Sequence, residues 1–202
     1  MTPDEFDRLL AEIRACTHCA DLPLGPRPIV RGRLSARLLI ISQAPGTRVH
    51  ETGLSFNDRS GERLRDWLGI DTDTFYDETG VAIVGMGLCY PGRDAKGGDL
   101  PPRRECAPLW HPRLLPRLAA VELTLLVGSY AINHYLGRQK MGPAIARWRD
   151  FLPDYFVLPH PSWRTTFWER QNPWFADELL PDLRARVAAA LTPPRSAPCP
   201  RR

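Results

Sequence analysis

The sequence predicts an α/β fold with three layers, in which helices cover both faces of a central four-stranded, mostly parallel sheet. Four short, continuous apolar runs are typical of strands buried on both faces. Stretches with helical spacing of apolar residues separate these runs, and such alternation favours parallel pairing with right-handed crossovers. The 202 residues, 43% hydrophobic and 25% charged, suit one globular domain.

The strands are expected at residues 38–41, 81–84, 123–127 and 155–158. Each run is rich in Leu, Ile and Val and stops at polar residues, glycine or proline. In a parallel sheet the carboxyl ends of the strands meet at one edge, where α/β proteins place their working sites. A single cleft is therefore expected there, built by the segments 42–46, 85–91, 128–130 and 159–162.

Helices are expected where apolar residues recur at helical spacing. The first covers residues 3–15, and Ser60 is a candidate cap for a helix that continues through Leu68. Others are expected at 108–119, 129–136, 144–150 and 173–191. One domain would then span residues 1–191, with 192–202 as a disordered basic tail.

Composition limits the class of protein. The formal net charge is +4 and the pI is near 9.0, with Lys96 and Lys140 as the two lysines. A basic excess suits a polyanion such as nucleic acid, although a GC-rich genome would also raise arginine over lysine. There is no apolar run long enough to span a membrane, and the acidic N-terminus differs from a secretory signal. We therefore expect a cytoplasmic monomer that does not enter membranes.

Four cysteines have the spacing of metal ligands. Cys16 and Cys19 form a C-x2-C pair, and Cys89 and Cys106 follow with sixteen residues between them. Four thiolates can hold a zinc ion or a [4Fe-4S] cluster, and the spacing does not choose between them. Small buried thiols are the alternative interpretation. Cys199 lies in the tail and is not assigned to the site.

The segments at the strand exits resemble a known family. Residues 43–46 are QAPG, residues 53–56 are GLSF, residues 59–61 are RSG and residues 160–162 are HPS. These resemble the two motifs of the uracil-DNA glycosylase superfamily, and the four cysteines fall where its iron-sulfur branch carries cluster ligands. The resemblance covers residues 16–175. It implies a [4Fe-4S] cluster and hydrolysis of the N-glycosidic bond of a base flipped out of DNA.

The resemblance also implies roles for individual residues. His160 would donate a hydrogen bond to the departing base as negative charge develops on it. Phe56 would stack on the extruded base. The remaining base-binding positions would be Gln43, Ala44, Pro45, Gly46 and Gly85. Contacts to DNA would come from Ser162, Trp163, Arg164 and Arg59, with Arg164 at the position of a wedge that fills the vacated stack.

The sequence departs from the family at the residue that activates water. Gln43 stands where the iron-sulfur branch usually carries an acid, and Ala44 stands where another branch carries aspartate. Neither side chain can act as a general base. Glu51 and His50 are therefore the candidates for activating water.

Two further departures concern the substrate. Gly85 stands where many members carry an asparagine that reads the edge of uracil, and Gly46 stands where some carry a tyrosine that excludes thymine. A pocket without either side chain should be less selective. We expect a relaxed range of bases in DNA, including deaminated purines as well as uracil.

The predicted activity is that of a monofunctional DNA glycosylase that leaves an abasic site. Strand cleavage through a Schiff base needs a lysine, and neither Lys96 nor Lys140 lies in the motifs. One alternative is a catalytically weak or inactive module on the same fold that binds damaged DNA. Another is a metal-dependent hydrolase with zinc at the cysteines, although four cysteines would close the coordination shell of that ion.

Overall fold

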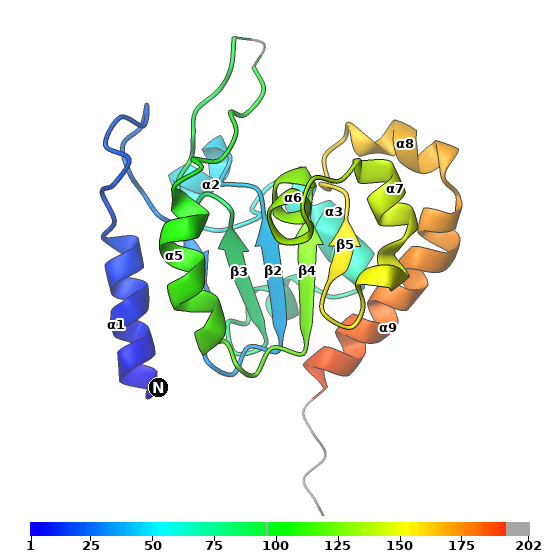
Figure 1. Ribbon diagram of the computed structural model, residues 1–202, viewed down its shortest axis with the longest axis horizontal. Coiled ribbons are helices and arrows are strands. Elements are labelled where there is room, and N and C mark those ends of the chain that lie inside the picture. The colour runs from blue at the N-terminus through cyan, green and yellow to red at the C-terminus, as the bar shows by residue number, and fades with distance from the viewer. Residues whose placement is uncertain (96, 193–202) are drawn as a thin grey trace, which may run out of the picture.

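The computed structural model describes residues 1–95 and 97–192, and within them the sheet has five strands in the order β1-β3-β2-β4-β5 (Figure 1). The strands are β1 (Val30–Arg31), β2 (Leu38–Ser42), β3 (Val81–Gly85), β4 (Leu123–Val127) and β5 (Phe156–Leu158). The four predicted strands are all present and pair in parallel. The sequence did not indicate β1, a two-residue edge strand antiparallel to β3, because two residues leave no periodic pattern.

Helices cover both faces of the sheet, which confirms the three-layer α/β prediction. Figure 1 shows α5 (Cys106–Leu114) and α6 (Ser129–Leu136) in front of the sheet, and α3 (Arg59–Leu68) and α9 (Leu180–Leu191) behind it. The helices α3 and α9 also pack against each other. The remaining helices are α1 (Pro3–Arg14), α2 (Thr47–Thr52), α4 (Thr72–Tyr76), α7 (Met141–Ala146) and α8 (Thr165–Gln171).

The helix ends differ from the prediction at four places. The helix expected at 173–191 is divided into a π-helical segment, Phe175–Leu179, and α9. Asp58, not Ser60, caps α3, because its carboxylate accepts a hydrogen bond from the Gly61 N–H at 2.9 Å. The helix expected from residue 108 begins at Cys106 and gives way after Leu114 to a 3-10 turn. Residues 144–150 belong to the end of α7 and a second 3-10 turn. The predicted tail lies outside the described residues, apart from Thr192.

The core forms where the apolar strands meet the helices. Leu38, Ile40 and Leu125 are fully buried, as expected for strands covered on both faces. The register places Ser42 of β2 beside Gly85 of β3, so the loops that follow these two strands start side by side. The carboxyl ends of the parallel strands therefore bring distant loops to one edge of the sheet.

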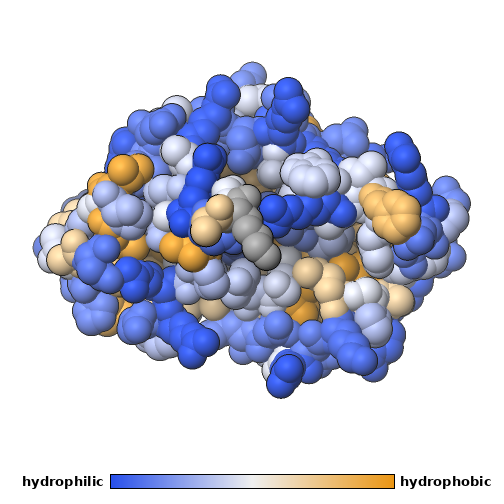
Figure 2. Space-filling model, turned by 90° about the horizontal axis from the view of Figure 1, so that it is seen from above, coloured by the Kyte–Doolittle hydropathy of each residue, from blue (hydrophilic) through white to orange (hydrophobic). Residues whose placement is uncertain are grey.

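That edge presents a polar surface. Seen from the side of the strand exits (Figure 2), hydrophilic residues dominate and hydrophobic ones lie in separate patches. No helix in the described part of the chain is long and apolar enough to cross a membrane.

Candidate active site

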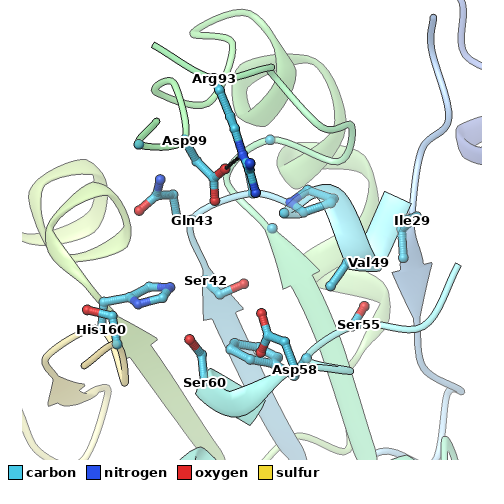
Figure 3. A pocket seen from close by; sticks show the side chains of 18 of the residues that line it. Ile29, Ser42, Gln43, Val49, Ser55, Asp58, Ser60, Arg93, Asp99 and His160 are labelled. Atoms are coloured by element: carbon cyan, nitrogen blue, oxygen red, sulfur yellow. Dashed lines mark ion pairs between the residues drawn. The ribbon is translucent and has the colours of Figure 1, made fainter. Parts of the chain in front are cut away.

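A cavity of about 410 Å³ lies at the carboxyl ends of the strands (Figure 3). The loops after β2, β3 and β5 supply its walls, together with the segment between α2 and α3. Phe56 and His160, 104 positions apart in the chain, both line it. The single cleft predicted from the strand exits is therefore present.

Most of the predicted site residues line this cavity. The structure brings together ten of them: Gln43, Ala44, Pro45, Gly46, Phe56, Gly85, His160, Ser162, Trp163 and Arg164. Trp163 is 79% exposed, and the guanidinium of Arg164 lies 5.8 Å from the centre of its ring. These two side chains stand at the open side of the cavity, where a large partner could reach them.

His160 follows β5 and points into the cavity (Figure 3). Its backbone is fixed by a tight turn, because its carbonyl accepts hydrogen bonds from the Ser162 N–H at 2.8 Å and the Thr165 hydroxyl at 3.3 Å. Burial lowers the pKa of the imidazole, an effect that the nearby Asp58 carboxylate opposes. A neutral imidazole can still donate one N–H, so His160 can act as a hydrogen-bond donor without carrying charge.

Phe56 forms a rigid aromatic wall of the cavity. Its φ of 56° is unusual for a residue other than glycine, and its ring meets Phe75 edge to face at 6.0 Å. The Tyr76 hydroxyl donates to the Phe56 carbonyl at 3.2 Å, and the Arg65 guanidinium lies 3.4 Å from the same oxygen. These contacts hold the strained backbone in place.

Arg63 connects the two motif loops. From α3 its guanidinium donates to the Ser162 carbonyl at 2.8 Å, to the Thr166 hydroxyl at 3.0 Å and to the Glu169 carboxylate at 2.5 Å. The helix that follows Phe56 is therefore fastened to the loop that carries His160. No local sequence pattern indicates this role of Arg63, because its contacts lie about one hundred residues away in the chain.

The structure does not bring the predicted water-activating residues into the cavity. On α2, Val49 lines the cavity, whereas the buried His50 packs against Tyr90 with ring centres 5.9 Å apart. Arg27 donates to the backbone carbonyls of His50 and Glu51, and the Glu51 side chain is exposed. A short helix directs successive side chains to different sides, so His50 and Glu51 lie away from the cavity that Val49 faces.

Two carboxylates that were not among the predicted site residues do line the cavity: Asp58 and Asp99. Asp58 caps α3, and an aspartate directly before a helical pattern is a sequence signal for an N-cap. Asp99 lies on the loop between β3 and α5, paired with Arg93 at 3.9 Å. Burial raises the pKa of the Asp99 carboxyl, while Arg93 lowers it. Arg59, predicted to contact DNA, is exposed at the start of α3 and is not part of the cavity wall.

Gly85 ends β3 without a side chain, and the structure leaves no room for one. A Cβ at this position would lie 2.3 Å from the Gly87 carbonyl oxygen. The Gly85 carbonyl accepts a hydrogen bond from His111 Nε2 at 3.0 Å, and His111 Nδ1 lies 2.5 Å from the Tyr135 hydroxyl. Burial lowers the pKa of His111, which favours the neutral ring, and a neutral ring can donate from Nε2 while its Nδ1 accepts from the Tyr135 hydroxyl. The end of β3 is therefore held in place by buried hydrogen bonds, and only backbone groups face the cavity there.

The four cysteines with ligand spacing line a second, smaller cavity together. Cys16, Cys19, Cys89 and Cys106 are free thiols around it. Burial raises the pKa values of Cys89 and Cys106 to about 11, and the Leu88 N–H donates to the Cys106 sulfur at 3.3 Å. Across the described residues, no three His, Cys, Asp or Glu side chains converge closely enough to hold a single metal ion. The thiols surround a space, and they are the residues that could hold a cofactor.

Comparison with known protein families agrees with the cavity geometry. The model of the uracil DNA glycosylase superfamily matches residues 29–184. That range contains the cavity residues from Ile29 to Arg164 and excludes the first pair of cysteines. Since the match covers most of the 202 residues, the chain belongs to the uracil DNA glycosylase superfamily.

Proposed function

We propose that this protein is a DNA glycosylase that removes uracil or another deaminated base from DNA by hydrolysing the N-glycosidic bond. The observation that carries the proposal is the placement of Phe56 and His160 on one cavity of about 410 Å³. Family membership suggests the same reaction class. A base must leave the DNA stack to reach such a cavity, at a cost of a few kcal/mol.

Each wall of the cavity can contribute to that reaction. Stacking on Phe56 would offset part of the cost of unstacking the base. As the glycosidic bond lengthens, negative charge grows on the base and positive charge grows on the sugar. The neutral His160 imidazole would donate a hydrogen bond to the base, and such a preorganised donor is worth about 3 kcal/mol of the barrier. Because His160 and Phe56 are both fixed by backbone contacts, the cavity needs little reorganisation.

The open side of the cavity fits a DNA partner. Trp163 and Arg164 stand at the cavity, and both are exposed. We propose that Arg164 enters the space vacated by the flipped nucleotide, while Trp163 stacks on a neighbouring base. The net charge of +4 would add attraction to the phosphate backbone.

The range of bases is proposed to be broad. Gly85 has no side-chain amide to hydrogen-bond a base edge, and Gly46 has no side chain to exclude a larger base. A protein rejects the wrong base when that base leaves polar groups of the pocket without hydrogen-bond partners. With few such side chains here, the pocket should distinguish uracil poorly from hypoxanthine or xanthine. The reaction is proposed to stop at the abasic site, since neither lysine belongs to the motifs and no lysine among the described residues lines the cavity; Lys96 lies outside those residues.

We also propose that the four cysteines hold a [4Fe-4S] cluster, as in the iron-sulfur branch of the superfamily. The donor set fits, because four thiols and no carboxylate line the small cavity. In a [4Fe-4S] cluster each iron binds one thiolate, so the four sulfurs can lie around a space of the size of the cluster. A single zinc ion would need all four sulfurs to converge on one point. The cluster would tie the loop after α1 to the segment between β3 and α5. Visible absorbance of the purified protein with about four irons per chain supports this proposal. Stoichiometric zinc without iron contradicts it.

The test of the activity is a panel of labelled oligonucleotides. Single- and double-stranded substrates would carry uracil, hypoxanthine, xanthine or only normal bases, and alkali would convert abasic sites into nicks. Alkali-dependent nicks at uracil and at least one deaminated purine support a broad, monofunctional glycosylase. Strict uracil specificity would contradict the broad range, and nicks without alkali would contradict the monofunctional reaction. Tight binding to damaged DNA without any cleavage would favour the binding module.

A further inference from the structure

The loop between β3 and α5 carries a carboxylate over the cavity. Its two sides are bridged at Arg93 and Asp99, and the Leu100 N–H donates to the Gly92 carbonyl at 2.9 Å. The Asp94 N–H donates to the Gly98 carbonyl at 2.8 Å. These backbone bonds give Asp99 a defined position, and Figure 3 shows its carboxylate directed into the cavity.

Asp99 lies against the segment after β2. A Cβ added to Gly46 would stand 3.5 Å from the Oδ2 atom of Asp99, an ordinary contact distance, so the carboxylate lies directly beside this segment. Figure 3 shows His160 on another wall of the same cavity. A nucleotide whose base reached Phe56 and His160 would therefore lie within the space that Asp99 faces.

Asp99 is better suited than Asp58 to accept a proton. Asp58 is already engaged, because its Oδ1 accepts the N-cap hydrogen bond from Gly61 at 2.9 Å. The ion pair of Asp99 with Arg93 is loose, at 3.9 Å, and leaves oxygen lone pairs for another partner. The charged groups that face Asp99 are Arg93 and Arg164, which favour its ionised form, and Asp58 and Asp94, which oppose it. The Asp99 side chain is 43% exposed, and its partial burial outweighs these charges and raises its pKa, which makes the carboxylate a stronger base.

We propose that Asp99 is the general base of the glycosylase reaction, an inference that rests on the proposed function. The bond between C1′ of the deoxyribose and the base nitrogen breaks, and its electron pair leaves with the base. A water oxygen forms a new bond to C1′, and the carboxylate of Asp99 accepts the proton that this water loses. The proton then passes to solvent or to the released base. This assignment places at Asp99 the role that neither Gln43 nor Ala44 can fill.

The test compares Asp99→Asn with two matched variants, Asp58→Asn and Asp94→Asn. Asp94 is on the same loop and does not line the cavity, and its Oδ1 accepts from the Gly98 N–H at 2.9 Å, which an asparagine can preserve. Single-turnover excision should fall by about 100-fold or more for Asp99→Asn, the usual effect of losing a general base, and should be unchanged for Asp94→Asn. The wild-type rate should rise with pH through an apparent pKa above the ordinary aspartate value of 3.8, and this rise should be absent from Asp99→Asn.

A binding measurement separates charge from folding. DNA with a cationic pyrrolidine in place of the sugar resembles the transition state, and DNA with a neutral tetrahydrofuran is its control. Wild type should bind the cationic DNA more tightly than the neutral DNA. In Asp99→Asn the ratio of these two affinities should fall about tenfold, with the affinity for the neutral DNA unchanged. Asp99 is not the base if wild type excises bases and the excision rate of Asp99→Asn stays within about threefold of the wild-type rate. The same follows if Asp58→Asn, and not Asp99→Asn, shows the large loss of rate. Either result leaves the glycosylase assignment intact, whereas a wild type that excises no base overturns both proposals.

Discussion

The carbonyl oxygen of Phe56 occupies the place where a side chain on Gly61 would begin. A Cβ built on Gly61 would stand 1.7 Å from that oxygen and 2.8 Å from the Phe56 Cβ. Gly61 lies in the first turn of α3, so this close approach joins the start of the helix to the turn that presents the aromatic ring. The absence of one methyl group thus sets the position of Phe56.

Gly61→Ala should therefore displace Phe56. The added methyl group must push the turn away, and overpacking of this kind costs about 1–3 kcal/mol of unfolding free energy. Urea denaturation measures this loss, and base excision should fall with it. Glu62→Ala changes an exposed neighbour on the same helix and serves as the control. An alanine variant with wild-type stability and activity would show that the turn can move freely.

The ion pair of Arg63 and Glu169 should couple the two motif loops. Glu169 Oε1 is buried without a hydrogen-bond partner, so the pairing of Oε2 with Arg63 is its main compensation. Arg63→Ala should cost about 1–3 kcal/mol and slow excision roughly tenfold, because the Ser162 carbonyl loses its donor. In a double-mutant cycle, Arg63→Ala and Glu169→Ala should together cost less than the sum of the two single changes. Additive losses would mean that the pair contributes no coupling.

Gly85→Asn should not create a selective uracil pocket. The new Cβ would meet the Gly87 carbonyl oxygen at 2.3 Å, so we expect a loss of stability of about 1–3 kcal/mol. The ratio of uracil to hypoxanthine excision should stay near that of wild type. Arg138→Asn is a suitable control, because Arg138 is exposed and is not part of the cavity wall. A stable variant with strong uracil preference would show that the loop 85–87 can rearrange.

Stability should decrease in mild acid because of His111. Its pKa in the folded protein lies below the ordinary value of 6.5, since burial disfavours the charged ring. The unfolded chain then binds the proton more readily, so the contribution of His111 is complete above about pH 6.5 and is lost as the pH falls through the folded pKa. The difference in unfolding free energy between wild type and His111→Gln should shrink from about pH 7.5 to about pH 5.5. If the difference in unfolding free energy grows on acidification, the pKa of His111 is raised and not lowered by folding.

The sequence predicted the features that depend on local pattern. Apolar runs located four strands, and the strand exits located the cavity, because parallel strands end at one edge of a sheet. The pattern missed the short helices α2, α4 and α8, which contain too few turns to show a periodic apolar face. As a result, His50 and Glu51 were expected to reach the cavity, although α2 turns both away from it.

The residues that the sequence missed act over long distances in the chain. Arg63 meets Ser162 from 99 positions away, and Asp99 comes from a loop with no regular pattern. No propensity or spacing rule indicates such contacts, because they arise only when the sheet brings the loops together. The sequence shows that Gly85 replaces the asparagine that contacts uracil in many members. It does not show why a glycine is needed there, because the close approach of the Gly87 carbonyl arises only in the folded backbone.

The role of His160 can be tested most directly by single-turnover excision of uracil from a labelled duplex by wild type, His160→Ala and His134→Ala. His134 is exposed and absent from the cavity wall, so its change controls for the loss of a histidine. If Phe56 and His160 together hold an everted base, His160→Ala should slow excision by about 100-fold, with affinity for a tetrahydrofuran duplex within about threefold of wild type. An unchanged excision rate in His160→Ala would contradict the assignment of this cavity as the place where the glycosidic bond breaks.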